Sequence, residues 1–276
     1  MPEGPEIRRA ADRLSRVLAG RRIERLYFAF PTLKKWETRL EGLQLQSVDT
    51  LGKHMLCRFD DGTCIYSHNQ LYGRWCVRPL DQYPDTGRQL RLALHTDRHS
   101  ALLYSASDID VVTAADLPNH ARLRGLGPDP LDRDVDRGAV IARLDAAPFR
   151  GRQLASLLLD QGFMAGLGNY LRSEILFAAG IHPKVRPRDC DPQALARLAR
   201  AILTLTRRSY RTGGVTNSPS VYRRLRNSGK ARGAARFAVF SRRGLPCLVC
   251  GTPVCRDNMG GRRVYYCRDC QPPGRV

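Results

Sequence analysis

The sequence lacks the features that would place the protein in a membrane or outside the cell. No apolar run approaches the roughly 18 residues that a membrane-spanning helix needs. The first residues carry arginines and acids in place of the apolar core of a secretion signal. Mean hydropathy is -0.38 and 42% of the 276 residues are hydrophobic, which is typical of a globular chain. We therefore expect a cytoplasmic protein with no membrane partner, and nothing in the sequence requires more than a monomer.

Acidic residues are also scarce. The chain has 26 Asp and Glu against 46 Lys and Arg, which gives a formal net charge of +20 and a pI near 10.3. Such an excess suits a polyanion, because each neutralised phosphate releases counterions. The alternatives are a merely basic surface or an anionic membrane, but no basic amphipathic helix ends the chain. We therefore expect a nucleic acid as the partner.

One stretch has no acid at all. Residues 207–243 contain eleven Lys and Arg and no Asp or Glu. Gly213, Gly214 and the string "TNSPS" lie within it, and such residues favour a loop. The sequence therefore predicts a long, basic, mobile loop here.

Disulfides are not expected, because nine cysteines are an odd number in a chain without an export signal. Four of them form two C-x-x-C pairs separated by 16 residues, which is the spacing of a structural zinc site. The four predicted ligands are Cys247, Cys250, Cys267 and Cys270. Redox dithiols are the alternative, but no thioredoxin-like pattern surrounds either pair. The prediction is one structural Zn²⁺ with no open position for chemistry.

The remaining cysteines have simpler assignments. Cys255 lies between the two pairs and is not expected to be a ligand, while Cys57, Cys64, Cys76 and Cys190 are expected to be apolar fillers. The segment between the pairs predicts a β-hairpin that turns near Gly260 and Gly261, with Arg262 and Arg263 at its tip. Arginines on a metal-stiffened hairpin suit contact with phosphate.

Periodicity divides the chain into three parts. Apolar residues at helical spacing predict a helix over 6–18, and alternating patterns predict strands from about 23 to 112, with a hairpin turn at Asp61 and Gly62. Helical patterns follow at 140–144, 154–159, 170–178 and 195–205. We expect an α+β multidomain protein with a β-rich domain over 1–124, a linker over 125–135, a helical domain over 136–235 and a zinc finger over 236–272.

The start of the chain, "MPEGPE", suggests an active site. If Met1 is removed, the nitrogen of Pro2 becomes a free secondary amine beside the carboxyl group of Glu3. The alternative is a capping start to the helix, which explains Pro5 and Glu6 but leaves Pro2 and Glu3 without a role.

Four strings and the two C-x-x-C pairs carry a resemblance that runs along almost the whole chain. They are "PEGPEIRRAADRL" at the start, "GKHML" (52–56), "YSHNQLYGRW" (66–75), "LLLDQGFMAGLGNYLRSEIL" (157–176) and the two C-x-x-C pairs. Together they resemble the formamidopyrimidine-DNA glycosylase/endonuclease VIII family, and Gly4 with "SHNQLYG" favours its bacterial endonuclease VIII branch. The resemblance implies an N-terminal β-sandwich with flanking helices, a helix–two-turn–helix domain and a C-terminal four-cysteine zinc finger hairpin.

The resemblance also implies a role for individual residues. Pro2 is similar to the family's nucleophile and Glu3 to its general acid. Lys53 is similar to the lysine that contacts the phosphate of the damaged nucleotide, and Asn169 and Arg262 are similar to a phosphate clamp. The resemblance thus implies four catalytic residues, namely Pro2, Glu3, Lys53 and Arg262. Glu6 and Glu174 are similar to the acids that orient the site. Residues similar to the family's DNA contacts are His68, Gln70, Leu71, Tyr72, Asn169, Tyr170 and Arg263, of which Gln70, Leu71 and Tyr72 fill the gap left in the duplex.

The implied activity is that of a bifunctional DNA glycosylase/AP lyase of base excision repair that removes oxidised pyrimidines and cuts the strand by β,δ-elimination. A terminal amine has a reference pKa of about 8, against roughly 10.4 for a lysine side chain, so more of it is neutral and nucleophilic near pH 7 than of a lysine. Glu3 must be protonated to act as an acid, so we expect burial to raise its pKa. The alternatives are an 8-oxoguanine/formamidopyrimidine-preferring enzyme of the same family and a non-catalytic zinc DNA-binding protein.

Overall fold

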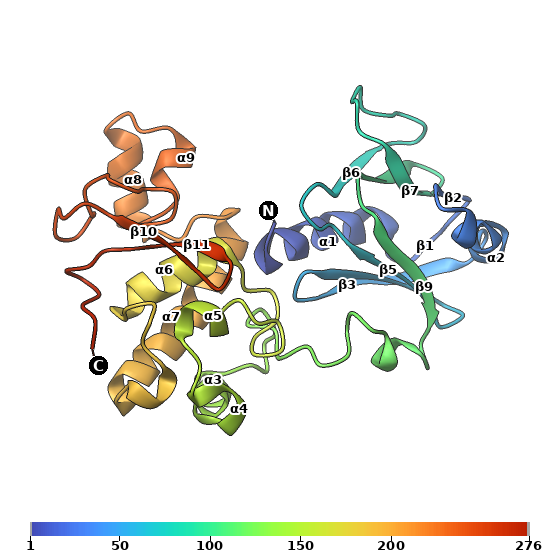
Figure 1. Cartoon of the computed structure of the whole chain (residues 1–276). Coiled ribbons are helices and arrows are strands. Elements are labelled where there is room, and N and C mark those ends of the chain that lie inside the picture. Colours follow the sequence, from blue (N-terminus) through green and yellow to red (C-terminus); the bar gives the residue numbers. More distant parts are fainter. Residues whose placement is uncertain (1, 275–276) are drawn as a thin grey trace. The chain divides into compact units, whose positions relative to one another are not determined.

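A computed structural model describes residues 2–274 of the chain (Figure 1). The chain forms two compact units, residues 1–125 and residues 126–276. The division falls at the start of the predicted linker, and the four-cysteine segment belongs to the second unit. The finer boundaries at residues 135, 235 and 272 remain predictions.

The first unit is a β-sandwich of two antiparallel sheets. One sheet has the order β1-β3-β4-β5-β9 and the other has the order β2-β7-β8-β6. The strands are β1 (Arg21–Arg22), β2 (Arg25–Phe28), β3 (Gln44–Leu51), β4 (His54–Phe59), β5 (Thr63–His68), β6 (Arg74–Pro79), β7 (Leu90–His95), β8 (His99–Tyr104) and β9 (Asp108–Thr113). The short helical elements are η1 (Pro31–Trp36), α2 (Glu37–Leu40) and η2 (Leu117–Asn119).

Two tight turns of the larger sheet follow from the sequence. The predicted turn between β4 and β5 is confirmed: Gly62 has φ +84°, and Asp61 accepts a hydrogen bond from the N–H of Thr63 at 2.8 Å. The turn between β3 and β4 contains only Gly52 and Lys53, and Gly52 has φ +60°. A two-residue hairpin turn requires positive φ at such a position, which places Lys53 at the tip of the hairpin.

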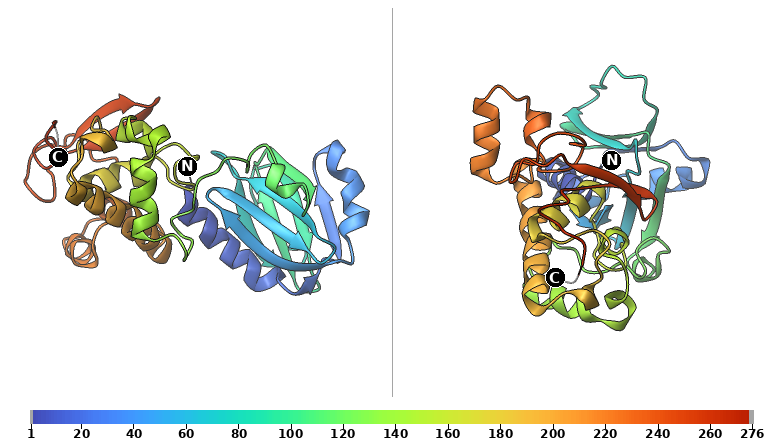
Figure 2. Two further views of the ribbon diagram at one scale, coloured as in Figure 1. Left: turned by 90° about the horizontal axis from the view of Figure 1, so that it is seen from below. Right: turned by 60° about the vertical axis from the view of Figure 1, so that its left-hand side comes forward.

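Helix α1 (Gly4–Leu18) completes the core of the first unit. It contacts β3, β4 and β8, and Figure 2 shows it lying along the sandwich. Its apolar residues at helical spacing, including Ile7, Leu14 and Leu18, are buried together with side chains from both sheets. Burial of each such side chain contributes about 1.5–3 kcal/mol to the stability of the folded unit. The tertiary packing therefore fixes the position of the residues that precede the helix.

The second unit is helical and ends in a β-hairpin. Its elements are α3 (Arg137–Asp145), α4 (Ala147–Arg150), α5 (Leu154–Leu157), α6 (Asn169–Ala179), η3 (Pro187–Asp189), α7 (Pro192–Thr212), α8 (Pro219–Asn227), α9 (Arg232–Ala235), β10 (Cys255–Met259) and β11 (Arg262–Tyr266). The hairpin predicted from the glycines at 260 and 261 is confirmed, since β10 and β11 pair from Cys255 with Tyr266 to Met259 with Arg262. Its strands border a small core that includes Val239, Val254 and Tyr265.

The helix predicted over 154–159 is shorter than expected and ends at Leu157. Side chains that follow it hold a non-helical turn, because Asp160 accepts a hydrogen bond from the N–H of Gly162 and Gln161 accepts one from Gly166. Side-chain acceptors of this kind compete with helical hydrogen bonds. The turn leads to α6, so the two helical segments predicted at 154–159 and 170–178 are joined by a glycine-bearing turn.

The prediction of a mobile loop over 207–243 is wrong. Helix α7 continues to Thr212, and α8 and α9 occupy much of the rest. Ser218 caps α8 by accepting a hydrogen bond from the N–H of Val221, and Pro219 occupies the first turn, where its missing N–H costs nothing. The string "TNSPS" is therefore a helix start, not a loop.

Within residues 2–274, no helix is both long enough and apolar enough to cross a membrane.

Candidate active site and nucleic-acid interface

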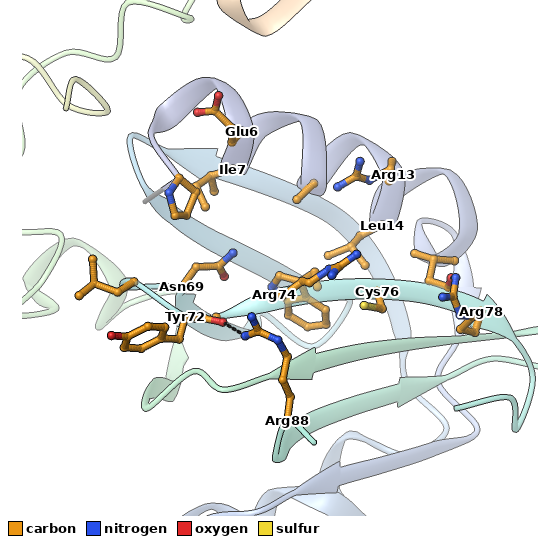
Figure 3. Close-up of a pocket in the computed structure, with 16 residues that line it drawn as sticks. Glu6, Ile7, Arg13, Leu14, Asn69, Tyr72, Arg74, Cys76, Arg78 and Arg88 are labelled. Atoms are coloured by element: carbon orange, nitrogen blue, oxygen red, sulfur yellow. Dashed lines mark hydrogen bonds between the residues drawn. The ribbon is translucent and has the colours of Figure 1, made fainter. Parts of the chain in front are cut away.

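An open cavity of about 510 Å³ lies beside the N-terminus in the first unit. Pro2 and Glu6 line one part of it, and Asn69, Leu71 and Tyr72 line another. Figure 3 shows the side chains of Asn69 and Tyr72 on the loop across from α1. Four arginines also line the cavity, namely Arg13, Arg74, Arg78 and Arg88. The sequence-predicted nucleophile therefore lies in a basic cavity that suits an anionic ligand.

Glu3 and Glu6 hold the residues in front of α1. Glu3 is the N-cap residue and is only 1% exposed. Glu6 accepts a hydrogen bond from the N–H of Glu3 at 3.0 Å, which satisfies a donor at the helix start. Capping therefore accounts for Glu3 as well as Glu6, contrary to the expectation from the sequence. The cap also fixes the position of Pro2, which directly precedes the N-cap residue.

The loop after β5 presents two apolar side chains to solvent. Leu71 is 58% exposed and Tyr72 is 69% exposed, so neither side chain belongs to the core. The loop is tight, because the N–H of Gly73 donates to the carbonyl of Asn69 at 2.7 Å and a Cβ at position 73 would lie 2.5 Å from that oxygen. Exposed apolar side chains on a rigid loop are typical of a binding surface.

Two further contacts hold this loop in shape. Gln70 has φ +50°, and its side-chain oxygen accepts a hydrogen bond from Ser107 at 2.8 Å. The guanidinium of Arg88 donates to the carbonyl of Tyr72 at 2.6 Å, drawn as the dashed line in Figure 3.

Asn69 is a candidate site residue that the sequence did not single out. It is 6% exposed, lines the same cavity as Pro2, and its Oδ1 is buried with no hydrogen-bond partner among the described residues. A buried acceptor without a donor costs about 1–3 kcal/mol, which a bound ligand can recover. Its position directly before Gln70, Leu71 and Tyr72 was the only sequence signal.

His68 belongs to a polar group behind the turn that carries Lys53. The rings of His54 and His68 stack with centroids 4.8 Å apart, and Nδ1 of His54 lies 2.9 Å from the hydroxyl of Tyr66. His68 also lies 3.8 Å from the carboxylate of Asp108. The side chain of His68 therefore contacts residues of its own unit, and through His54 it packs next to the turn that carries Lys53.

His54 is neutral at physiological pH. Burial lowers its pKa to about 3, and the charges of His68, Lys53, His120 and Arg122 act in the same direction. The ring of His54, the residue after Lys53, is therefore uncharged and does not repel the Lys53 cation.

The depressed pKa of His54 predicts a pH-dependent stability. Between pH 6.5 and about 3, the unfolded chain binds a proton at His54 that the folded chain does not, so stability is complete above pH 6.5 and falls as the pH falls. Relative to His54→Phe, the native protein should lose on the order of 3 kcal/mol between pH 7 and pH 4. Urea unfolding of both proteins at several pH values measures this difference. Parallel curves would contradict it, whereas His95 and His182, which do not contact His54, titrate in both proteins and cancel.

In the second unit, Arg172 connects two predicted phosphate contacts. Its guanidinium is fully buried and donates to the side-chain oxygen of Asn169 at 2.7 Å. It also donates to the carbonyls of Met259, Arg262 and Arg263 at 2.8, 3.2 and 2.9 Å. The first residue of α6 and the turn of the β10–β11 hairpin are therefore held together. The sequence did not indicate this residue, because its partners lie 3 and about 90 positions away.

Arg262 and Arg263 are both exposed at the end of the hairpin, as predicted. Asn169 begins α6, where backbone N–H groups point out of the helix and favour an anion. Through Arg172, these three residues are held close to one another in the second unit.

Tyr170 and Glu174 have interior positions. The Tyr170 side chain is 5% exposed, its hydroxyl lies 2.7 Å from that of Ser209, and its ring packs on Phe237. The buried side chain of Tyr170 is therefore not placed to contact DNA directly. The carboxylate of Glu174 accepts hydrogen bonds from the hydroxyl of Thr216 at 2.6 Å and from three successive backbone N–H groups, of residues 238–240, at 2.8 Å each.

The four predicted metal ligands come together. All four sulfur atoms lie within 4.8 Å of one another, with Cys247 and Cys270 at 3.9 Å and Cys250 and Cys267 at 3.4 Å. Four thiolates around Zn²⁺ at about 2.3 Å give similar separations. Burial raises the pKa of Cys267 and Cys270, whereas hydrogen bonds with Thr252 lower the pKa of Cys250 to about 6. A cation is what allows all four to be thiolates at once, so the cluster suits a metal ion.

Comparison with known proteins identifies the family. The model of the formamidopyrimidine-DNA glycosylase N-terminal domain matches residues 1–107, and the model of its H2TH domain matches residues 126–220. The chain is 44% identical to endonuclease 8 of Klebsiella pneumoniae over 272 residues, which span 98% of this chain and 100% of the relative. It is 43% identical to endonuclease 8 of Escherichia coli over the same spans. The chain belongs to the formamidopyrimidine-DNA glycosylase/endonuclease VIII family.

The fold of this family is confirmed by solved structures. The chain superposes with a TM-score of 0.80 on Lactococcus lactis Fpg (MutM) in complex with DNA containing an oxidised pyrimidine, at 20% identity and covering 99% of this chain and 100% of that one. The β-sandwich, the H2TH domain and the four-cysteine hairpin are those of the family. As a member of the formamidopyrimidine-DNA glycosylase/endonuclease VIII family, the protein is a DNA glycosylase/AP lyase of base excision repair.

Proposed function

We propose that this enzyme removes oxidised pyrimidines from duplex DNA with Pro2 as its nucleophile, and then cuts the strand by β,δ-elimination. The observation that carries the proposal is the position of Pro2 in an arginine-lined cavity, held by the cap of α1 and facing a loop with exposed Leu71 and Tyr72. The substrate preference is supported by the identity to endonuclease 8 over almost the whole chain.

The chemistry begins when the free amine of Pro2 attacks C1′ of the damaged nucleotide. The C1′–N bond breaks, and the base leaves with its electron pair and a proton from an acid, the role proposed for Glu3. The attacking nitrogen then loses its proton, the C1′–O4′ bond of the sugar opens, and O4′ takes up a proton, which leaves an open-chain iminium. Because the proline nitrogen is secondary, this iminium has no N–H to lose and remains cationic. It acidifies C2′, so loss of that proton expels the 3′ phosphate, and a second elimination expels the 5′ phosphate. Water then hydrolyses the remaining iminium and frees Pro2.

Access to C1′ requires that the base leave the stack, which costs a few kcal/mol and least for a damaged base. Leu71 and Tyr72 supply apolar surfaces to fill the gap, and Gln70 supplies polar atoms for the orphaned base. Asn69, buried beside Pro2, would contribute its amide to the extruded nucleotide. Lys53, on its turn backed by neutral His54, would hold the adjacent phosphate.

Asn169, Arg262 and Arg263 would bind further phosphates from the second unit. Arg262→Ala is therefore expected to weaken binding to damaged and undamaged duplexes equally. It should also lower the slope of log K against log salt by about 0.9, the value for one phosphate contact. Fluorescence anisotropy at several salt concentrations measures both. A loss confined to lesion-containing DNA would instead make Arg262 a recognition residue.

The cysteine cluster would hold one structural Zn²⁺ that stiffens the hairpin carrying these arginines. With four sulfur ligands no position is left for water, so the metal takes no part in the reaction. We also propose that the enzyme acts as a monomer in the bacterial cytoplasm.

The lesion preference is tested with duplexes that contain thymine glycol, 5-hydroxyuracil, 8-oxoguanine or an abasic site. Oxidised pyrimidines and the abasic site should be cut fastest. Preference for 8-oxoguanine would favour the purine-directed alternative within the family. An intact-mass measurement first establishes that the protein lacks Met1. If that protein did not nick the abasic duplex, a non-catalytic zinc DNA-binding protein would be favoured.

A further inference from the structure

The α8–α9 arm, residues 218–235, is a basic projection of the second unit (Figure 1). No residue of α8 is buried, and its apolar residues Val221, Tyr222 and Leu225 are only half-buried. Its charged side chains are all basic and all exposed, namely Arg223, Arg224, Arg226, Lys230 and Arg232. No acidic residue lies between positions 207 and 243 to neutralise them.

Folding of the arm does not account for this charge. The helix dipole favours Arg224 and Arg226 in the last turn of α8. However, Arg223 and Arg226 are three positions apart on α8, so their like charges repel at a cost of about 0.2–0.5 kcal/mol. Within residues 2–274, no ion pair involves Arg223, Arg224 or Arg226, whereas several other arginines of the chain do pair with acids. A partner of opposite charge would remove the repulsion.

The base of the arm is rigidly attached. Asn217 donates its amide to the carbonyl of Ala235 at 2.8 Å, and the guanidinium of Arg232 donates to the carbonyl of Gly213 at 2.8 Å. The hydroxyl of Thr216 donates to Glu174 of α6 at 2.6 Å, and Glu174 also binds the N–H groups just after the arm. The arm therefore has a fixed geometry relative to α6.

The same base lies close to the predicted phosphate contacts. Phe237, two residues after the arm, packs on Tyr170 with ring centroids 5.3 Å apart, and Tyr170 follows Asn169 directly. A rigid basic helix is thus anchored next to the start of α6, where an anion is favoured.

We propose that the α8–α9 arm binds the sugar–phosphate backbone of duplex DNA through Arg223, Arg224 and Arg226, in addition to the contacts of Asn169 and Arg262. This inference rests on the proposed function, since it assumes a DNA substrate. The contact is electrostatic and independent of sequence and lesion. It extends the footprint of the enzyme on DNA beyond the damaged nucleotide.

The test compares a triple variant with a matched control. Arg223→Gln, Arg224→Gln, Arg226→Gln removes the proposed contacts, and Arg137→Gln, Arg150→Gln, Arg200→Gln removes three exposed arginines from α3, α4 and α7 of the same unit. Both proteins lose three positive charges. The arm variant should lower the salt slope of binding to undamaged duplex by about 2–3, since each phosphate contact contributes about 0.9. The control should leave the slope unchanged.

A third protein guards against loss of folding. Replacing the same three arm residues with lysine keeps the charge and should restore most of the slope, because lysine also binds phosphate as a point charge. Equal loss in the arm and control variants would overturn the proposal, because it would reveal a net-charge effect only. Loss confined to lesion-containing duplex would also overturn it and assign the arm to base recognition. Nicking of an abasic duplex by the native enzyme is measured alongside, so that failure of the proposed function is seen separately.

Discussion

A protein that retains Met1 is expected to lose both base removal and strand cleavage. An inserted leucine between Met1 and Pro2 would prevent removal of Met1, so Pro2 would carry an amide nitrogen with no nucleophilic electron pair. Pro2→Gly leaves only a primary amine, whose adduct can lose its N–H proton and with it the permanent cation. Loss of a nucleophile costs a factor on the order of 10³ or more in rate.

The measurement is trapping with borohydride, which reduces the iminium to a stable protein–DNA bond. The native protein should form this adduct on an abasic duplex, and both variants should fail to form it at a comparable rate. Pro5→Ala is the matched control, because Pro5 lies in the first turn of α1 and has no role in the proposed chemistry. Normal trapping by the Met1-retaining protein would show that another nitrogen is the nucleophile.

The second large effect is expected from the cysteine cluster. Cys267→Ser removes a buried ligand, so the protein should lose its metal and the β10–β11 hairpin should lose its fixed shape. In small zinc modules the metal contributes about 10–16 kcal/mol to folding, far more than this hairpin can supply by packing alone. Because the hairpin carries Arg262 and Arg263, affinity for all duplexes should fall by about tenfold to a hundredfold.

Cys255→Ser is the matched control, since Cys255 lies on the same hairpin but outside the cluster. Zinc content by mass spectrometry under native conditions and duplex affinity by anisotropy are measured for both variants. The control should keep one zinc and native affinity. If Cys267→Ser kept both, the cluster would have no structural metal role.

Much of the fold could be predicted because it depends on local pattern. The turn at Asp61 and Gly62 and the hairpin turn at Gly260 and Gly261 were found because glycine marks positions that need positive φ. The helix after Pro2 was found because apolar residues recur along one face. The α8–α9 arm was missed because proline and serine signal both loops and helix starts, and only the cap formed by Ser218 distinguishes them.

The site was predicted less completely than the fold. Pro2, Glu3 and the four cysteines have chemistry that is visible in the residue types themselves. The residue types of Arg172 and Asn69 give no such signal. Arg172 matters because its hydrogen-bond partners lie far along the chain, and Asn69 because its buried Oδ1 has no partner among the described residues. Tyr170 shows the reverse, since the family resemblance implied a DNA contact for it while its ring lies in the core.

The sequence by itself determined most of the elements, the four clustered cysteines, the basic charge and a proline at position 2, because each depends on residue type and spacing. The tertiary structure alone decided that Glu174 serves as an acceptor for residues 238–240, that His54 is neutral behind Lys53, and that the basic stretch is a pinned helical arm. The physical reason is that burial, pKa and hydrogen-bond partnership depend on residues brought together from distant positions, which no local pattern encodes.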